Sequence, residues 1–123
     1  MIIGIGTDIV EIERIEKAIK TNERFLDKLF TEEENAFFKS KAMRAEVIAG
    51  NFAAKEAISK ALGTGIRGFS FRDIEVLRDD LGKPIAKLNE KAVRILKNKE
   101  YNLNVSISHN NSSAIAFAVI EEK

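Results

Sequence analysis

The longest helix that the sequence predicts covers residues 44–62, RAEVIAGNFAAKEAISKAL. Alanine, the strongest helix former, is frequent in this stretch. Gly63 follows directly, and glycine readily takes the left-handed conformation that ends many helices. We therefore expect a long helix in the middle of the chain that stops at Gly63.

Glu56 and Lys60 lie four residues apart and so share one face of this helix. The residues around them are mostly small, which lets another group approach closely. One interpretation is a surface ion pair worth about 0.3–0.5 kcal/mol. The other is a carboxylate for a metal ion beside an ammonium group for a phosphate. The helix alone does not decide between them.

The N-terminal segment predicts a short buried strand. Its isoleucines are interrupted by Gly4 and Gly6, which indicate that another part of the backbone approaches closely. The chain is expected to leave the strand at Asp8, where a helix begins. Asp8 is then either a metal ligand, since Mg²⁺ binds one or two carboxylates together with phosphate oxygens and water, or an acid that caps the helix.

Further helical segments are predicted between this strand and the long helix. Isoleucines at positions 12, 15 and 19 lie on one face of the first, which ends near Thr21. Residues 23–30 form a further turn or two. Thr31 followed by Glu34 is a capping box, which predicts a helix over residues 31–40.

Two pairs of strands are predicted after the long helix. They are expected over residues 73–78, 84–88, 103–108 and 114–120. A glycine-rich loop over residues 63–70 precedes them, and a helix over residues 89–98 separates the pairs. We therefore predict one α+β domain, residues 1–123, in the order β-ααα-ββ-α-ββ. One mainly antiparallel sheet would carry the helices packed to one side.

Composition excludes several classes of function. The absence of cysteine excludes disulfides, thiol nucleophiles and cysteine-based metal sites, and a single histidine excludes a site with several histidine ligands. A net charge of +1 gives no bulk attraction to nucleic acid or to a membrane surface. No apolar run reaches the roughly 18 residues of a membrane span, and the start lacks a signal peptide's basic region. We therefore expect a cytoplasmic protein.

Two further groups of residues suit contacts with a phosphate-bearing ligand. Gly63 and Gly65 either end the helix or expose backbone N–H groups as an anion nest. Ser106 and Ser108 share one strand face, with His109 at the strand end. These three residues suit phosphate or sugar contacts, or they belong to a half-exposed strand with a polar cap. A Ser-His-acid hydrolase would be expected to carry a G-x-S-x-G motif, which is missing.

Basic residues recur every three or four positions near the N-terminus. They form a stripe with one threonine if the segment stays helical: Arg14, Lys17, Thr21, Arg24 and Lys28. An acidic helical partner would dock on such a stripe. The alternative is a solvated surface with ordinary pairs between residues four apart.

Five motifs occur in order along nearly the whole chain: GIGTDIVEIERI, FTEEE, FAAKEAISKALGTGI, LGKP and SISH. In this order and spacing the chain resembles the holo-acyl-carrier-protein synthases, which are 4′-phosphopantetheinyl transferases. The most specific part combines G-x-D near the start with K-E-A-x-x-K farther on. Asp8 and Glu56 mark the two motifs.

The resemblance implies transfer of the phosphopantetheine arm of coenzyme A to a serine of acyl carrier protein, with release of adenosine 3′,5′-bisphosphate. By motif position, Asp8 and Glu56 would hold Mg²⁺, Lys60 would face the phosphates, and these three residues would be catalytic. Contacts with coenzyme A would come from Lys60, Gly63, Gly65, Lys83, Pro84, Ser108 and His109. Arg14 and Arg24 would meet the acidic carrier protein. Family members are typically trimers with active sites between neighbouring subunits.

Two residues depart from the family pattern. Asn51 stands where the family often has arginine, and Asn110 stands where a small hydroxyl residue is usual. Two other functions also stay open from the residues alone. One is a non-catalytic module that binds a nucleotide or coenzyme A, and the other is a magnesium-dependent nucleotide phosphohydrolase. The general base is open too, among Glu56, Asp8 and a metal-bound water.

Overall fold

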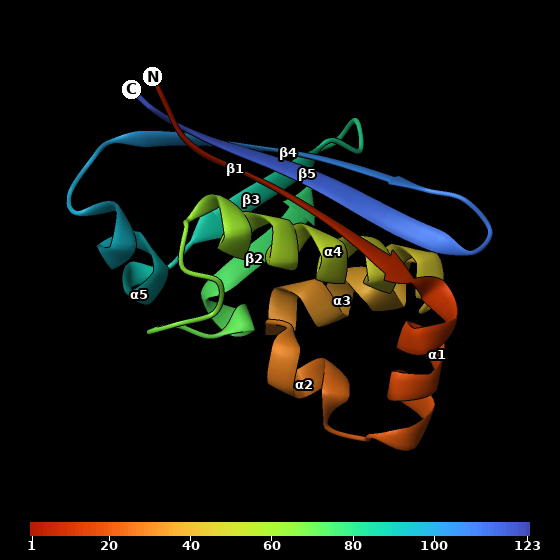
Figure 1. Cartoon of the computed structure of the whole chain (residues 1–123). Coiled ribbons are helices and arrows are strands. Elements are labelled where there is room, and N and C mark those ends of the chain that lie inside the picture. Colours follow the sequence, from red (N-terminus) through yellow and green to blue (C-terminus); the bar gives the residue numbers. More distant parts are fainter.

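Five strands, five helices and two short 3-10 turns build the computed structural model, which describes residues 1–123 (Figure 1). In chain order the elements are β1 (Ile2–Glu11), α1 (Ile12–Thr21), α2 (Phe25–Leu29), α3 (Glu32–Ser40), α4 (Ala45–Ala61), η1 (Phe71–Asp73), β2 (Ile74–Arg78), β3 (Pro84–Leu88), α5 (Glu90–Val93), η2 (Arg94–Leu96), β4 (Tyr101–His109) and β5 (Ser113–Glu122). The predicted α+β class is confirmed.

The strands form two antiparallel sheets, so the prediction of a single sheet is wrong. One sheet has the order β1-β5-β4, and the hairpin β2-β3 forms the other. Strand β3 packs beside β4 without ladder hydrogen bonds between them. Alternating hydrophobicity identifies a strand but does not specify its partner, which is why the sequence did not show the division.

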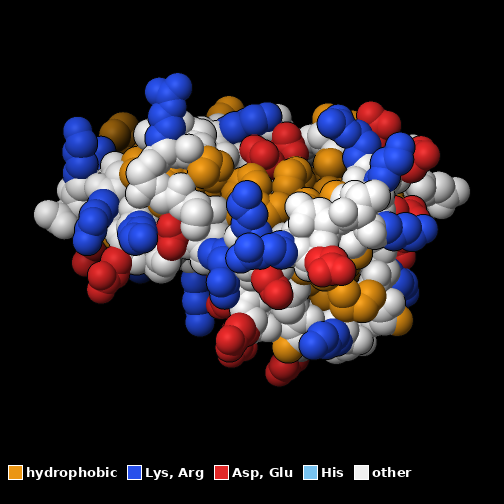
Figure 2. Space-filling model, turned by 90° about the horizontal axis from the view of Figure 1, so that it is seen from below, with side chains coloured by type: hydrophobic (Ala, Val, Ile, Leu, Met, Phe, Trp, Pro, Cys, Tyr) orange, Lys and Arg blue, Asp and Glu red, His pale blue; other side chains and the backbone are white.

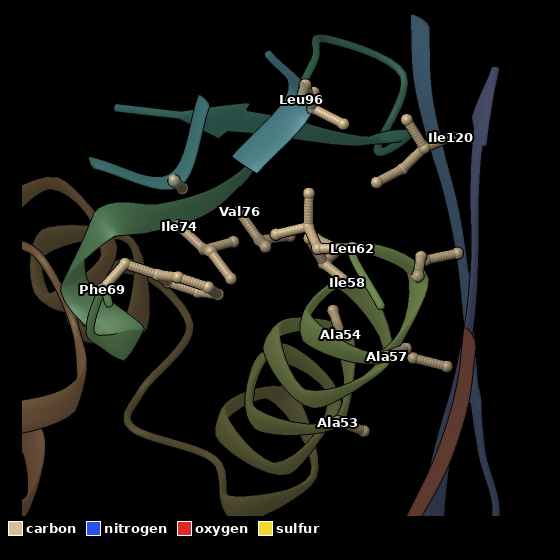
Figure 3. Close-up of a cluster of buried hydrophobic side chains, with 14 residues drawn as sticks. Ala53, Ala54, Ala57, Ile58, Leu62, Phe69, Ile74, Val76, Leu96 and Ile120 are labelled. Carbon is tan, nitrogen blue, oxygen red and sulfur yellow. The ribbon is translucent and has the colours of Figure 1, made fainter. Parts of the chain in front are cut away.

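Helix α4 lies across the inner face of the three-stranded sheet, and the other helices lie on the same side (Figure 1). Its apolar residues fill the core between the two sheets. Figure 3 shows Ile58 and Leu62 of α4 facing Ile74 and Val76 of β2, with Ile120 of β5 beyond. These side chains are excluded from water, so α4 is the element on which both sheets pack.

Strand β1 approaches α4 as closely as two backbones can. A Cβ atom at Gly4 would lie 1.9 Å from the Ala61 carbonyl oxygen, and one at Gly6 would lie 2.0 Å from that of Ala57. No side chain fits at either glycine, which confirms the predicted close approach. The small residues of α4 therefore make room for β1.

Strand β1 is longer than predicted. It pairs with β5 as far as Glu11, and Asp8 lies opposite Ala116 within the ladder. Asp8 is therefore a strand residue and not the cap of a helix, because pairing with β5 carries the extended conformation past the glycines.

The other boundaries follow the predictions with one exception. The Thr31 capping box is present: Thr31 N–H donates to Glu34 Oε1 at 2.9 Å, and Glu34 N–H donates to Thr31 Oγ1 at 3.1 Å. The helix predicted over residues 89–98 is only α5 followed by η2, because Lys97 and Asn98 take left-handed conformations. None of the helices combines the length and apolar character that a bilayer crossing requires.

Candidate active site

Asp8 and Lys60 meet where β1 runs along the second half of α4. Asp8 projects from the inner side of β1 and its side chain is 17% exposed. Lys60 Nζ donates to the Thr7 carbonyl oxygen at 2.9 Å and lies 3.4 Å from Asp8 Oδ1. The close packing of β1 on α4 thus places a carboxylate beside an ammonium group.

Glu56 lies one helical turn before Lys60. Partial burial raises the pKa of Glu56 above its ordinary value, and the charge of Asp8 raises it further, whereas Lys60 acts in the opposite direction. The raised pKa shows that the Asp8 and Glu56 carboxylates repel each other in a partly desolvated site. A cation placed between them would relieve that repulsion.

The donor set fits a magnesium ion that is shared with a phosphate-bearing substrate. Nowhere in the chain do three or more His, Cys, Asp or Glu side chains gather in a way that could enclose a metal. Two carboxylates leave most of an octahedral shell for phosphate oxygens and water, as Mg²⁺ prefers. Asp8 and Glu56 thus suit an open magnesium site.

Two open pockets adjoin on the outer face of the three-stranded sheet. One, of about 300 Å³, is lined by Asp8 and Lys60, and the other, of about 320 Å³, by Ser108 and His109. Both include Ile9 and Ile115, so they are neighbours. Ser106 and Ser108 lie on the exposed face of β4, as predicted. The fold therefore brings Ser108 and His109 next to the pocket of Asp8 and Lys60.

The loop glycines end helix α4. Gly63 N–H donates to the Lys60 carbonyl oxygen at 2.9 Å, and Gly65 N–H donates to that of Ser59 at 3.2 Å. Both glycines have positive φ angles. Their N–H groups are therefore engaged within the chain, which favours the helix-ending interpretation over the anion nest.

The remaining predicted ligand residues lie elsewhere. Lys83 and Pro84 lie at the turn of the β2-β3 hairpin, where Lys83 N–H donates to Asp79 Oδ1 at 2.9 Å, and they line neither pocket. Arg14 is exposed on α1, and Arg24 immediately precedes α2.

The predicted basic stripe is not a single helix face. Helix α1 ends at Thr21, and the next residue is extended, so the chain turns before Arg24. Arg14 therefore stands on a different helix from Lys28. The predicted end of the first helix near Thr21 is thus confirmed, and the condition for one continuous stripe is not met.

A buried polar cluster behind the site was missed. Lys55 is fully buried and donates to the carbonyl oxygens of Leu29 and Phe71, each at 2.8 Å, and to Glu34 Oε1 at 2.6 Å. Asn51 is also buried and donates to the Val76 carbonyl oxygen at 2.8 Å, so it is a core residue and makes no surface contact. The available signal was the position of Lys55 among alanines on a helix that is apolar nearly all round.

Comparison with known proteins agrees with this geometry. The family model described as the 4′-phosphopantetheinyl transferase superfamily matches residues 4–118. A holo-[acyl-carrier-protein] synthase of Clostridium beijerinckii is 60% identical over 121 residues, covering 98% of each chain. That of Clostridium perfringens (strain ATCC 13124) is 61% identical over 126 residues, covering 98% of this chain and 95% of the relative.

Solved structures show the same architecture. The holo-(acyl-carrier-protein) synthase of Bacillus anthracis, in complex with CoA (3′,5′-ADP), has a TM-score of 0.84 and 43% identity, covering 100% of this chain and 99% of that one. The synthase of Neisseria meningitidis has a TM-score of 0.89 and 38% identity, covering 99% and 100%. The chain therefore belongs to the 4′-phosphopantetheinyl transferase superfamily and, within it, to the holo-[acyl-carrier-protein] synthases.

Proposed function

We propose that this chain transfers the 4′-phosphopantetheine arm of coenzyme A to a serine of apo acyl carrier protein. The products are holo acyl carrier protein, which fatty acid biosynthesis requires, and adenosine 3′,5′-bisphosphate. The observation that carries the proposal is the convergence of Asp8, Glu56 and Lys60 beside a pocket, in a member of the synthase family. The attacking hydroxyl belongs to the carrier, so the chain needs no nucleophile of its own.

Asp8 and Glu56 would hold Mg²⁺ at this site. When bound, the ion neutralises charge on the pyrophosphate of coenzyme A and stabilises the leaving phosphate. Lys60 adds a second, compact positive charge, and its side chain is 53% exposed and so accessible to a phosphate. Catalysis in this site rests on positioning and charge neutralisation.

The serine proton requires an acceptor. Glu56, Asp8 and a metal-bound water are the three candidates. The raised pKa of Glu56 belongs to the metal-free site, and Mg²⁺ bound to this carboxylate would lower it, so the shift does not select Glu56 as the base.

Coenzyme A would lie along the two adjoining pockets. Ser108 and His109 are exposed there and offer two hydroxyl or imidazole contacts for its phosphates or ribose. The N–H groups of Gly63 and Gly65 are engaged, and the Gly65 carbonyl oxygen accepts from Thr64 Oγ1 and Arg67 N–H, so these glycines would meet the ligand through van der Waals contact. Lys83 and Pro84 would reach the ligand from a separate part of the surface.

The carrier protein would dock on the basic side chains around α1 and α2. Arg14 and Arg24 are exposed, and neither takes part in an ion pair within the chain. They are free to meet the carboxylates of an acidic partner, which steers association and sets specificity.

We also propose that three copies of the chain assemble, with active sites between subunits. The outer face of the three-stranded sheet carries four exposed apolar side chains: Ile5, Ile9, Ile115 and Phe117. Ile9, Ile115 and Phe117 also line the pockets of the candidate site, so a subunit covering this face would border the site.

Light scattering on Phe117→Ser tests the assembly. The variant is expected to have a lower molar mass in solution than the wild-type assembly, whereas Leu81→Ser is expected to have the wild-type molar mass. Leu81 is a matched control because it is 95% exposed at a hairpin turn away from this face. A monomeric wild-type protein would contradict the trimer.

We further expect the enzyme to act in the cytoplasm.

One assay separates the proposed activity from its alternatives. The protein is incubated with apo acyl carrier protein, coenzyme A and Mg²⁺, and the mass of the carrier is then measured by mass spectrometry. A gain of one phosphopantetheine arm is the expected result. Release of nucleotide phosphate without carrier would instead indicate a phosphohydrolase, and binding of coenzyme A without either product would indicate a non-catalytic module.

A further inference from the structure

A basic pocket lies between the short helix α2 and η1, on the face opposite the three-stranded sheet. It has a volume of about 550 Å³ and is lined by Asn22, Arg24, Asp27, Lys28 and Arg72. Figure 2 shows Lys and Arg side chains gathered in the middle of this face. No apolar side chain lines the pocket. Three basic residues against one acidic residue suit a polar, anionic ligand.

The three cations of this pocket have no charged partner within the chain. The only ion pairs of the structure are Arg44–Glu46, Lys55–Glu34 and Lys60–Asp8. Asp27 is the single carboxylate among the lining residues, and it lies beyond ion-pair distance of all three cations. The pocket thus keeps an excess of positive charge that an external anion would neutralise.

Arg72 comes from a different part of the chain than the other two cations. It belongs to η1, whereas Arg24 and Lys28 belong to α2 and its start. Arg72 also affects the fully buried Lys55. Burial is the main cause that lowers the pKa of Lys55, and the positive charge of Arg72 lowers it further. An anion bound at Arg72 would relieve this repulsion between two cations.

Lys55 fixes the separation of the two walls of the pocket. Its ammonium group donates to the carbonyl oxygen of Leu29, which follows Lys28, and to that of Phe71, which precedes Arg72, each at 2.8 Å. One buried side chain thus anchors both backbones immediately beside the pocket cations. The spacing of Lys28 and Arg72 is set before any partner arrives.

We propose that Arg72 is a specificity-determining residue for the carrier protein: together with Arg24 and Lys28 it forms a pocket that receives a carboxylate side chain of acyl carrier protein. This inference rests on the proposed transferase function and extends its docking surface from α1 and α2 to η1. A guanidinium group suits the task because it binds a carboxylate through two parallel hydrogen bonds.

Steady-state kinetics of Arg72→Gln test the inference, with Arg94→Gln as the matched control. Arg94 is also an exposed arginine of a 3-10 turn without an ion pair, but it lies in η2 and lines none of the pockets described. Arg72→Gln is expected to raise the KM for apo acyl carrier protein about three- to fivefold. The KM for coenzyme A, kcat at saturating carrier and the melting temperature are expected to stay at wild-type values.

Two further measurements separate docking from a structural role. The carrier KM of Arg72→Gln is expected to depend less on salt concentration than that of wild type, since one screened charge pair is gone. Arg72→Lys is expected to restore part of the lost affinity, because it keeps the charge but not the two-pronged geometry.

Each contrary outcome identifies what has failed. If the wild-type protein transfers the arm but Arg72→Gln and Arg94→Gln have equal KM values for the carrier, the pocket does not bind the carrier. The proposed transferase function would still hold. A raised KM for coenzyme A would overturn it as well, because the anion bound would then be the cofactor phosphate. Absence of transfer by the wild-type protein would refute the proposed function and, with it, the assignment of this pocket to the carrier.

Discussion

Lys55 and Glu34 form an ion pair with no contact to solvent: the Nζ and Oε1 atoms are 2.6 Å apart and both side chains are 0% exposed. Two backbone carbonyl oxygens accept the remaining protons of Lys55. Glu34 in turn accepts the N–H groups of Thr31 and Val76. The pair therefore joins α4 to α3, β2 and the end of α2, and Lys55 immediately precedes Glu56 in α4.

Replacing Lys55 by methionine is expected to destabilise the fold by about 3–5 kcal/mol, because Glu34 would keep a buried charge without its partner. Urea unfolding followed by circular dichroism measures the change. Lys39→Met is the control, since Lys39 is exposed on α3 and its loss should stay within about 0.5 kcal/mol. Equal stability of the two variants would show that the pair carries no net stabilisation.

Gly6→Ala is expected to cost about 3 kcal/mol or more, because its methyl group would fall 2.0 Å from the Ala57 carbonyl oxygen and neither backbone can yield cheaply. Transfer activity should fall with it as β1 moves Asp8 away from Lys60. Gly50→Ala is the comparison: its methyl group would lie 2.9 Å from one side-chain atom, Cγ2 of Ile107, and not against a backbone carbonyl, and alanine favours the helix, so a smaller loss of stability is expected. Thermal unfolding and transfer rates are compared. A folded, fully active Gly6→Ala would refute the close-packing argument.

Glu56→Ala is expected to lower the transfer rate by about two to three orders of magnitude with coenzyme A in excess, since it removes one of the two carboxylates proposed to hold Mg²⁺. Addition of Mg²⁺ should raise the melting temperature of wild type but not that of the variant. Glu33→Ala, which removes an exposed carboxylate from α3, should behave as wild type in both measurements. Near-normal transfer by Glu56→Ala would overturn the metal assignment.

The raised pKa of Glu56 predicts how stability depends on pH when no divalent cation is present. Above the ordinary value of 4.5 and below the raised value, the folded protein binds more protons at Glu56 than the unfolded chain does. The contribution of Glu56 to the free energy of unfolding therefore decreases as pH rises through this interval. Denaturant unfolding in EDTA, with Glu56→Gln as reference, isolates that contribution.

In Asp8→Asn, the free energy of unfolding should fall less steeply as pH rises through this interval. The substitution removes the charge of Asp8 but leaves the burial of Glu56 intact. An equal decrease in wild type and Asp8→Asn would show that the two carboxylates do not interact.

Arg14→Glu is expected to raise the KM for acyl carrier protein and to leave the affinity for coenzyme A nearly unchanged, because Arg14 is exposed on α1 and lines neither pocket of the candidate site. Transfer kinetics with each substrate varied in turn measure both quantities. Arg94→Glu controls for the change in net charge. Altered affinity for coenzyme A together with normal carrier binding would refute the docking role of α1.

Local signals in the sequence predicted much of the fold. The Thr31 and Glu34 capping box and the glycine at position 63 each act within a few residues, so the bounds of α3 and α4 could be predicted. The length of β1 could not be predicted in this way. Pairing with β5 extends the strand past Asp8, and local propensity does not. The division into two sheets depends in the same way on partners far apart in the chain.

The candidate site was predicted only in part. Asp8, Glu56 and Lys60 were identified by motif, and the raised pKa of Glu56 and the Asp8–Lys60 contact place them together. Lys55 was missed because a buried lysine looks like any other helical lysine until Glu34 is brought opposite it. The contribution of Arg72 to the basic pocket likewise exists only after η1 has packed beside α2.

The pairing of β1 with β5 has a consequence for how the enzyme folds during translation. β1 is made early and has β5 as its only strand neighbour, and Glu122 N–H donates to the Met1 carbonyl oxygen at 2.8 Å. A nascent polypeptide that has already made α4 still lacks the strand that holds Asp8 in register. Translation must therefore pass residues 113–122 before β1 can hold Asp8 beside Lys60, so the candidate site assembles only after the C-terminal strand has been made.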